Sequence, residues 1–194
     1  ERRALFLMSK TILIVSGGIE AAGAAKRAKE MGLFVVVSDR DPQAPGFEFA
    51  DSCIIADVYG ADETAAAAER YNRKIRKIDG VICVAADAPV TAARVAERLG
   101  LPGISVASAE TACDKLAMKT CFKNAGVPVP WFTGVETPQA LHRIAIERGR
   151  DLVVIKPVDS RGSRGVQRIS RVEDLDKAFL QARQHSPTER VMVE

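Results

Sequence analysis

The sequence predicts an α/β protein with a parallel, doubly wound sheet, followed by a linker helix and a second, smaller α+β unit. Short apolar runs rich in β-branched residues alternate with helical stretches up to about residue 106. This alternation is typical of parallel sheets that carry helices on both faces. A long helical stretch and a proline-containing extended segment then interrupt it. Two strands separated by a polar loop follow, which indicates a separate unit.

Composition and charge are those of an ordinary globular chain. Its 194 residues are 47% hydrophobic and 27% charged, which provides enough apolar material for a sizeable core. The net charge of +3 is mildly basic, and lysine and arginine do not gather with aromatic residues, so we expect no nucleic-acid partner. No apolar run approaches the ~18 residues that span a bilayer, so we expect no membrane partner.

The cysteine pattern also limits the class of protein. None of the four cysteines forms a CxxC pair, and two lie in apolar, strand-like runs; the four are Cys53, Cys83, Cys113 and Cys121. The pattern predicts buried, reduced thiols in a cytoplasmic protein and no metal site.

The two ends of the chain have unusual sequences. Residues 1–7 precede Met8 and lack the apolar region and cleavage site of a signal peptide. We interpret residues 1–7 as a remnant of an expression vector and Met8 as the natural start. The sequence stops within an alternating strand pattern at Glu194, so we expect a fragment of a longer protein.

The first predicted elements form one βαβ unit. Residues 11–15 (TILIV) are a strand buried on both faces, and Ser16-Gly17-Gly18 ends it. An alanine-rich helix over residues 19–31 leads through Gly32 to a second buried strand over residues 33–37. Such a unit has a right-handed crossover, and ligands bind beyond the carboxyl ends of its strands.

The same alternation continues to residue 104. It predicts strands at 52–56, 80–85 and 103–104 and helices at 61–75 and 89–99. The result is a Rossmann-like sheet of about five parallel strands, in a domain over residues 8–108.

The second half of the chain has a different organisation. A linker over residues 109–130 contains a helix, predicted over 108–125 with a cap at Ser108, and then Val127-Pro128-Val129-Pro130, which proline keeps extended. Residues 131–194 form a partial α+β unit. Its predicted elements are helices at 137–148 and 172–184 and strands at 152–156, 166–169 and 190–194.

One loop in this unit has the residues that bind phosphate. Lys156 ends a buried strand, where lysine is rare without a partner. A loop with two serines, two arginines and two glycines follows, made of Ser160, Arg161, Gly162, Ser163, Arg164 and Gly165. Its backbone amides can surround anionic oxygens, and its arginines add positive charge. The alternative is a plain β-hairpin with a flexible polar tip.

A second motif lies in the linker helix. Asp114-Lys115 starts it, and Lys119 follows Lys115 by one turn, so both lysines share a face. The helix leads into Ala125-Gly126-Val127-Pro128-Val129-Pro130. Alone, this stretch indicates only a solvated basic face.

Taken together, these motifs resemble the ATP-grasp superfamily. The order and spacing carry the resemblance: Asp114-Lys115, Ala125 to Pro130, Lys156-Pro157, Gly162-Ser163-Arg164-Gly165, and Val191-Met192-Val193-Glu194. The chain is most similar to the carbamoyl-phosphate synthase and biotin carboxylase branch, or to a free-standing carboxylate–amine ligase. The resemblance makes the first domain a pre-ATP-grasp domain and the last unit a truncated ATP-grasp subdomain.

The resemblance implies roles for individual residues. Lys115 and Lys156 match the phosphate-binding lysines, the loop over residues 160–165 matches the loop that closes on the triphosphate, and Glu194 matches the hinge residue beside adenine. The implied chemistry is attack of a carboxylate on the γ-phosphate of ATP, followed by displacement of phosphate by an amine.

The resemblance also implies what the chain lacks. The Mg²⁺ and ribose ligands fall beyond residue 194, so we expect no catalytic residue in this chain and no ligation by it alone. The expected partners are ATP and a small carboxylate or amine substrate; the sequence leaves the oligomeric state open, a homo-oligomer included.

The carboxyl edge of the first sheet offers a substrate-side site. Ser16, Gly17 and Gly18 follow the first strand, Asp39 the second and Asp87 the fourth. By resemblance, this edge faces the acceptor substrate.

Two other functions remain open. One is an NAD(P)-binding Rossmann module with a regulatory domain, although the glycines at 17, 18 and 23 do not form GxGxxG. The other is a non-catalytic nucleotide-binding module.

Overall fold

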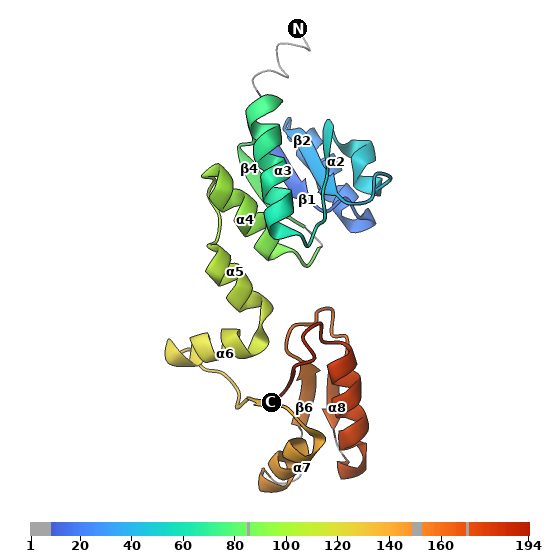
Figure 1. Cartoon of the computed structure of the whole chain (residues 1–194), viewed down its shortest axis with the longest axis vertical. Coiled ribbons are helices and arrows are strands. Elements are labelled where there is room, and N and C mark those ends of the chain that lie inside the picture. The colour runs from blue at the N-terminus through green and yellow to red at the C-terminus, as the bar shows by residue number, and fades with distance from the viewer. Residues whose placement is uncertain (1–8, 85, 149–152, 170) are drawn as a thin grey trace. The chain divides into compact units, whose positions relative to one another are not determined.

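The chain divides into two compact units, which are described separately (Figure 1). Unit 1 extends to Glu110, and unit 2 comprises Thr111–Glu194. The computed structural model describes residues 9–84, 86–148, 153–169 and 171–194. The predicted vector remnant, residues 1–7, therefore lies outside the described residues, as do positions 85 and 152 of two predicted strands.

Unit 1 contains a parallel sheet, as predicted. Its strands are β1 (Thr11–Val15), β2 (Phe34–Asp39), β3 (Ser52–Ile55) and β4 (Gly80–Cys83). They lie in the order β3-β2-β1-β4, and every neighbouring pair is parallel. Parallel pairing brings the carboxyl ends of all four strands to one edge of the sheet.

Helices cover both faces of this sheet (Figure 1). They are α2 (Ile19–Glu30), α3 (Ala61–Lys74) and α4 (Pro89–Leu99), with a short 3-10 turn η1 (Pro45–Phe49). On one face, Ile14 and Val37 pack against Ala25 of α2. On the other, the side chains come from strands, α3 and α4 and include Leu13, Val36, Ala65, Ala68 and Val95. Burial on both faces is the reason that these strands are continuous apolar runs.

The predicted fifth strand at residues 103–104 is wrong. The described part of unit 1 has four strands, and residues 101–105 carry no strand. Pro102 has no amide hydrogen for a ladder. Gly103 instead packs on α4, where a Cβ at its position would lie 2.9 Å from the Cβ of Ala96.

The predicted single helix over residues 108–125 is two helices. They are α5 (Val106–Cys113) and α6 (Lys115–Asn124). Asp114 separates them in an extended conformation, and its carboxylate accepts a hydrogen bond from the amide of Ala117 at 2.8 Å. Asp favours such N-caps over helix interiors because its side chain competes for backbone hydrogen bonds. The predicted cap at Ser108 is also wrong, because the Ser108 amide donates to the hydroxyl of Ser105 at 3.1 Å.

Unit 2 contains an antiparallel sheet. Its strands are β5 (Thr133–Val135), β6 (Val153–Pro157), β7 (Gln167–Ile169) and β8 (Val191–Val193), in the order β5-β8-β6-β7. Strand β5 was not predicted, because three residues with a central glycine give no strand signal of their own. It forms by pairing with β8, where Thr133 lies opposite Val193.

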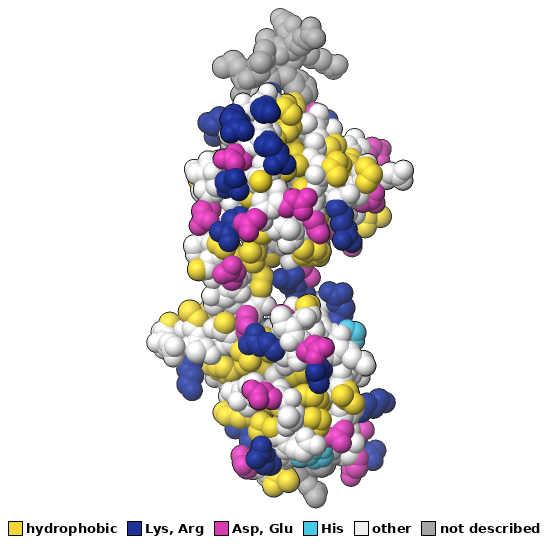
Figure 2. Space-filling view, viewed as in Figure 1, with side chains coloured by type: hydrophobic (Ala, Val, Ile, Leu, Met, Phe, Trp, Pro, Cys, Tyr) yellow, Lys and Arg dark blue, Asp and Glu magenta, His cyan; other side chains and the backbone are white. Residues whose placement is uncertain are grey.

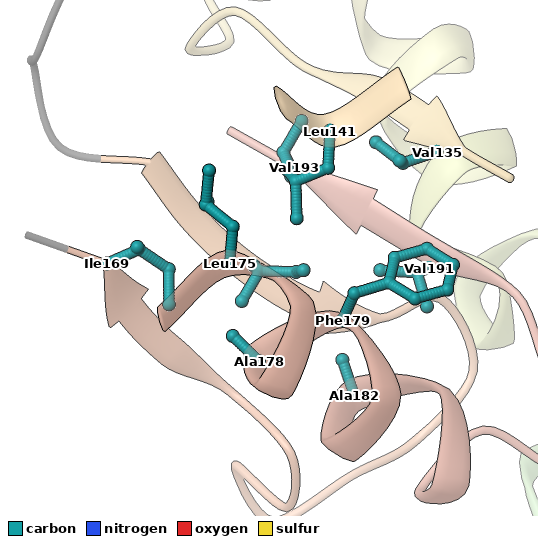
Figure 3. Packing of buried hydrophobic residues seen from close by; sticks show 10 residues of the cluster. Val135, Leu141, Ile169, Leu175, Ala178, Phe179, Ala182, Val191 and Val193 are labelled. Carbon is teal, nitrogen blue, oxygen red and sulfur yellow. The ribbon is translucent and has the colours of Figure 1, made fainter. Parts of the chain in front are cut away.

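Two helices cover one face of this sheet (Figure 3). They are α7 (Pro138–Glu147) and α8 (Leu175–Gln184), and a 3-10 turn η2 (Val172–Asp174) precedes α8. Helix α8 presents a stripe of apolar residues at helical spacing, Leu175, Ala178, Phe179 and Ala182. In Figure 3 these side chains pack toward Ile169 and Val191 of the sheet.

Several surface features complete the fold. Lysine and arginine side chains gather near the upper end of unit 1 in Figure 2. Helix α3 ends with Arg73 and Lys74, whose positive charge suits the carboxyl end of a helix. Among the described residues, no helix has both the length and the apolar character of a membrane span. The four cysteines form no disulfide, but the prediction of burial is wrong for Cys53 and Cys121, which are exposed. Cys53 points outward from an edge strand.

Candidate functional site

A groove of about 420 Å³ lies within unit 2. We call it the lysine groove. Its walls come from the end of α5, from α6, from β6 and the loop that follows it, and from Glu194 after β8. The lining residues are Ala112, Cys113, Lys115, Met118, Val154, Lys156, Ser160, Arg161, Gly162, Ser163, Val166 and Glu194.

The sheet of unit 2 places two charged residues in this groove. Side chains alternate between the faces of a strand. Ile155 and Val193 face the core under α7 and α8, so Lys156 and Glu194, one position further, face the groove. Two backbone hydrogen bonds between Val154 and Glu194, at 2.8 and 3.0 Å, fix the register of the two segments.

The carboxylate of Glu194 lies between two ammonium groups. One oxygen pairs with Lys156 Nζ and the other with Lys119 Nζ of α6. The three side chains are only 18%, 14% and 11% exposed, respectively. Burial raises the pKa of Glu194, but the hydrogen bonds from Lys119 and Lys156 outweigh burial and hold the pKa below its ordinary value.

Lys115 is fixed against the start of the loop. Its ammonium donates to the carbonyl oxygens of Val158, at 3.2 Å, and of Ser160. Its backbone amide also donates to the Val158 carbonyl, at 3.0 Å. Burial lowers the pKa of Lys115, and repulsion from Lys156 and Arg161 lowers it further, against partial compensation by nearby carboxylates. The groove therefore holds more positive charge than its own acids balance.

The loop over residues 160–165 has an unusual backbone. Gly162, Ser163 and Gly165 all have positive φ angles, of 62°, 57° and 72°. This conformation is costly for residues other than glycine, so Ser163 is a strained position. Gly165 is further required by space, because a Cβ there would lie 2.9 Å from the side chains of both His185 and Pro157.

The two arginines of this loop lie differently. Arg161 lines the groove, and its Nη2 donates to the thiol of Cys113 at 3.0 Å. Arg164 is exposed, and its Nε donates to the carbonyl of Arg161 at 3.1 Å. Arg164 and Gly165 do not belong to the groove lining. The structure thus brings together seven of the nine residues predicted to bind ATP and leaves these two outside.

Two carboxylates anchor the ends of the groove. Asp159 accepts hydrogen bonds from Ser186 Oγ at 2.6 Å and from the amide and hydroxyl of Thr188. Burial raises the pKa of Asp159, but these hydrogen bonds outweigh it and hold the pKa below its ordinary value. Asp114, the cap of α6, pairs with Arg190 at 2.6 Å. Asp159 thus holds the turn before β8 against the loop after β6, and Asp114 holds Arg190 against the start of α6.

Sequence reasoning missed five lining residues and one supporting residue. The lining residues are Ala112, Cys113, Met118, Val154 and Val166, and Lys119 supports the groove by pairing with Glu194. The spacing of Lys115 and Lys119 by one helical turn was a signal that both lysines face the same way.

The predicted substrate-side residues lie in unit 1. Ser16 has a φ of 89°, and its hydroxyl accepts from the amide of Gly18 at 3.3 Å. The carboxylate of Asp39 accepts from the amide of Gly17 at 2.8 Å, so it holds the turn after β1. Asp87 follows β4 at the same edge of the sheet. A substrate contact at these residues stays a prediction.

A backbone contact covers part of this turn. The amide of Gly46 in η1 donates to the Gly17 carbonyl at 2.7 Å. A Cβ at Gly46 would lie 2.9 Å from the Gly17 Cα, and one at Gly17 would lie 2.9 Å from the Ala44 Cβ. Both glycines are therefore required by close packing of two main chains.

The described residues contain no group of three or more His, Cys, Asp or Glu side chains that could hold a metal ion. The acids of the lysine groove are each paired with a cation or capped by hydrogen bonds, as described above for Glu194 and Asp159. Mg²⁺ therefore does not fit the donor set of these residues by themselves.

Comparison with known proteins finds similarity to ATP-grasp proteins. Residues 25–103 match the family described as ATP-grasp N-terminal domain. An uncharacterized protein of Sinorhizobium fredii is 29% identical over 168 residues, which is 86% of this chain and 34% of that protein. A cyanophycin synthetase of Crocosphaera subtropica is 34% identical over 90 residues, which is 46% of this chain and 10% of that protein.

The solved structures extend the likeness to both units. A biotin carboxylase of Campylobacter jejuni, solved in a complex with β,γ-ATP, has a TM-score of 0.69 and 25% identity. The alignment covers 99% of this chain and 46% of that one. The chain is thus similar to ATP-grasp N-terminal domains over residues 25–103, and each of its units has the fold of the matching part of this biotin carboxylase. It spans about a third and a tenth of the length of the two curated relatives.

Proposed function

We propose that the lysine groove binds the phosphates of ATP and that the chain supplies the ATP-binding part of a carboxylate–amine ligase. The observation that carries the proposal is the convergence of Lys115, Lys156 and Arg161 from three segments on one groove. Their positions on α6, β6 and the following loop are set by the fold of unit 2 alone.

The charge balance of the groove supports an anionic ligand. The pKa of Lys115 is lowered by burial and by its cationic neighbours, so its charged form is only partly compensated by nearby carboxylates. A polyphosphate would supply the missing negative charge and would raise this pKa again. Ammonium and guanidinium groups form short, charge-assisted hydrogen bonds to phosphate oxygens.

The loop supports the same ligand. Successive residues with positive φ angles turn their backbone amides toward a common point, which is a common way to bind phosphate. Gly162 and Ser163 both line the groove, and glycine lets an anion approach the main chain closely.

The lining of the groove also contains residues that suit the base. Met118, Val154 and Val166 are apolar lining residues, and Glu194 and Lys156 provide an acceptor and a donor beside them. Apolar walls with a few polar groups are typical of sites for flat heterocycles. This arrangement supports adenine beside Glu194.

The proposed chemistry is acyl transfer through an acyl phosphate. A substrate carboxylate attacks the γ-phosphorus of ATP and releases ADP, and an amine then displaces phosphate from the acyl carbon. In such reactions the protein mainly positions the phosphates and neutralises their charge. Lys115, Lys156 and Arg161 would do this here. No step is assigned to Mg²⁺, because the described residues hold no site for it.

Several observations favour this function over the alternatives. An NAD(P) module would need an accessible glycine-rich turn in unit 1, whereas Gly17 is packed against Gly46. The match to the ATP-grasp N-terminal domain covers residues 25–103 of unit 1. A cytoplasmic location is part of the proposal, because the four cysteines form no disulfide. A non-catalytic nucleotide module would share the groove and would differ only in turnover.

Binding of ATP and ADP by variants of Lys156 tests the proposal. We expect Lys156→Ala to weaken both affinities by about 10- to 100-fold, because a charge-assisted contact to phosphate is lost. Isothermal titration calorimetry measures this, with Lys123→Ala as the control, since Lys123 is an exposed lysine of α6. Equal affinities of the wild type and Lys156→Ala would contradict the assignment of the groove.

A further inference from the structure

Lys119 is buried although it does not line the lysine groove. Its residue is 9% exposed, and its ammonium pairs with the Glu194 carboxylate. The same ammonium lies 5.6 Å from the centre of the Phe132 ring. A buried lysine loses hydration and side-chain entropy, so its position needs an explanation.

Glu194 explains it. The carboxylate has two cationic partners, and one of them, Lys156, is also proposed to contact phosphate. If the Lys156 ammonium turns toward a phosphate, Glu194 loses that partner. A largely buried carboxylate without a partner costs several kcal/mol in typical cases, and that cost would oppose nucleotide binding.

We propose that Lys119 is a positioning residue that keeps Glu194 paired and so leaves Lys156 available to the nucleotide. The inference rests on the proposed ATP site. Lys119 does not line the groove itself, and its ammonium acts through Glu194, which does. In its absence Glu194 would hold Lys156 as its single partner.

A charge count gives the same conclusion. Lys119 and Lys156 together carry two positive charges against one negative charge on Glu194. Without Lys119 the pair of Lys156 and Glu194 is neutral, and the remaining cations of the groove are Lys115 and Arg161. Lys119 thus supplies the surplus positive charge, although Lys119 is not one of the residues that line the groove.

ADP affinity of three variants tests this role. We expect Lys119→Met, which keeps the length of the side chain but removes its charge, to weaken ADP binding about tenfold or more. Lys123→Met is the matched control on the same helix, and we expect a change below about twofold because Lys123 is exposed. Lys119→Arg keeps the charge and should retain most of the affinity.

Removal of the negative charge of Glu194 should restore ADP affinity to a variant that lacks Lys119. In Lys119→Met/Glu194→Gln, no buried carboxylate competes for Lys156, so we expect ADP affinity within about threefold of Glu194→Gln alone. A merely structural role of Lys119 predicts no rescue. Thermal unfolding of each variant checks that unit 2 is folded before titration.

The pH dependence provides a second readout. The charged groups around the Glu194 carboxylate are Lys119 and Lys156, with Lys115 and Arg161 further along the groove. Loss of Lys119 removes one of the hydrogen bonds that lower the pKa of Glu194. Protonation of Glu194 then releases Lys156, so the affinity of Lys119→Met should approach that of the wild type as the pH falls toward the ordinary glutamate pKa of about 4.

The outcomes separate the two proposals. If the wild type does not bind ADP, the proposed function fails and this inference with it. If the wild type binds and Lys119→Met binds equally well, only the role of Lys119 is overturned. A tenfold loss that Glu194→Gln does not rescue also overturns it.

Discussion

The two sheets of this protein use their faces differently. In unit 1, apolar side chains cover both faces, with α2 on one side and α3 and α4 on the other. In unit 2, α7 and α8 cover one face with an apolar core. The other face carries Lys156 and Glu194. The same elements, strands and helices, therefore produce an apolar layer in one unit and a charged groove in the other.

This difference shows which face of a sheet can carry ionised side chains. A face covered by an apolar helix has no room for ionised groups, because burial of an unpaired charge is too costly. In unit 2, Lys119 of α6 and Lys156 of β6 pair with the Glu194 carboxylate. This pairing allows ionised side chains to be largely buried on that face of the sheet.

The largest expected effect concerns the apolar face of unit 2. Phe179→Ala should destabilise this unit by about 3–5 kcal/mol, because it leaves a cavity among buried side chains. The neighbouring substitution Leu180→Ala is the control and should cost less than about 0.5 kcal/mol, since Leu180 is 53% exposed. Denaturant unfolding measures both. Equal losses would show that α8 does not pack on the sheet as described.

An intermediate effect concerns the glycine contact of unit 1. Gly46→Ala should cost about 1–3 kcal/mol, because its Cβ would lie 2.9 Å from the Gly17 Cα and two main chains would have to separate. Gly23→Ala in α2 is the opposite case, since nothing lies within 4 Å of the place that the new Cβ would take. Alanine is the better helix former there, so a stabilisation of about 0.5–1 kcal/mol is expected. Thermal unfolding distinguishes the two signs.

The smallest expected effect concerns stability in acid, and it is absent at neutral pH. Among the described residues, Asp114, Asp159 and Glu194 of unit 2 have lowered pKa values, whereas unit 1 has one such carboxyl, Asp79. A lowered pKa stabilises the fold above the ordinary carboxyl pKa of about 4, and this contribution is lost as the pH falls to the folded-state pKa. Unit 2 should therefore lose stability before unit 1 below about pH 4.

Amide hydrogen exchange at pH values from 6 to 3 follows the two units separately. Asp159→Asn provides the control, because it removes the titrating group while it keeps one acceptor oxygen, for either Ser186 or Thr188. This variant should show a weaker acid dependence in unit 2. Parallel loss of protection in both units would contradict the assignment of the acid-sensitive contacts.

Local patterns in the sequence were sufficient for most elements. Helix α4 begins at Pro89 and ends at Leu99 as predicted, because proline suits a first helical turn and Gly100 adopts the left-handed conformation with a φ of 63°. Strand β5 and the break at Asp114 were not predicted. The first exists through its partner β8, and the second depends on a side-chain cap that also pairs with Arg190.

Part of the candidate site could be predicted from the sequence in the same way. The order of motifs indicated Lys115, Lys156 and the loop over residues 160–165, which the structure brings to one groove apart from Arg164 and Gly165. The pairing of Lys119 with Glu194 could not be predicted, because the sequence shows on which helical face Lys119 lies but does not show its partner. Arg161 and Arg164 look equivalent in the sequence, yet one lines the groove and the other is exposed.

The sequence by itself determined the apolar strands, the helix ends and the order of the motifs, because these depend on side-chain periodicity and on backbone preferences within a few residues. Only the tertiary structure decided which charges meet. Glu194 gains Lys119 and Lys156 as partners because α6, β6 and the segment after β8 pack together. Such contacts join residues far apart in the chain, and burial of both partners, which no local pattern records, sets their strength.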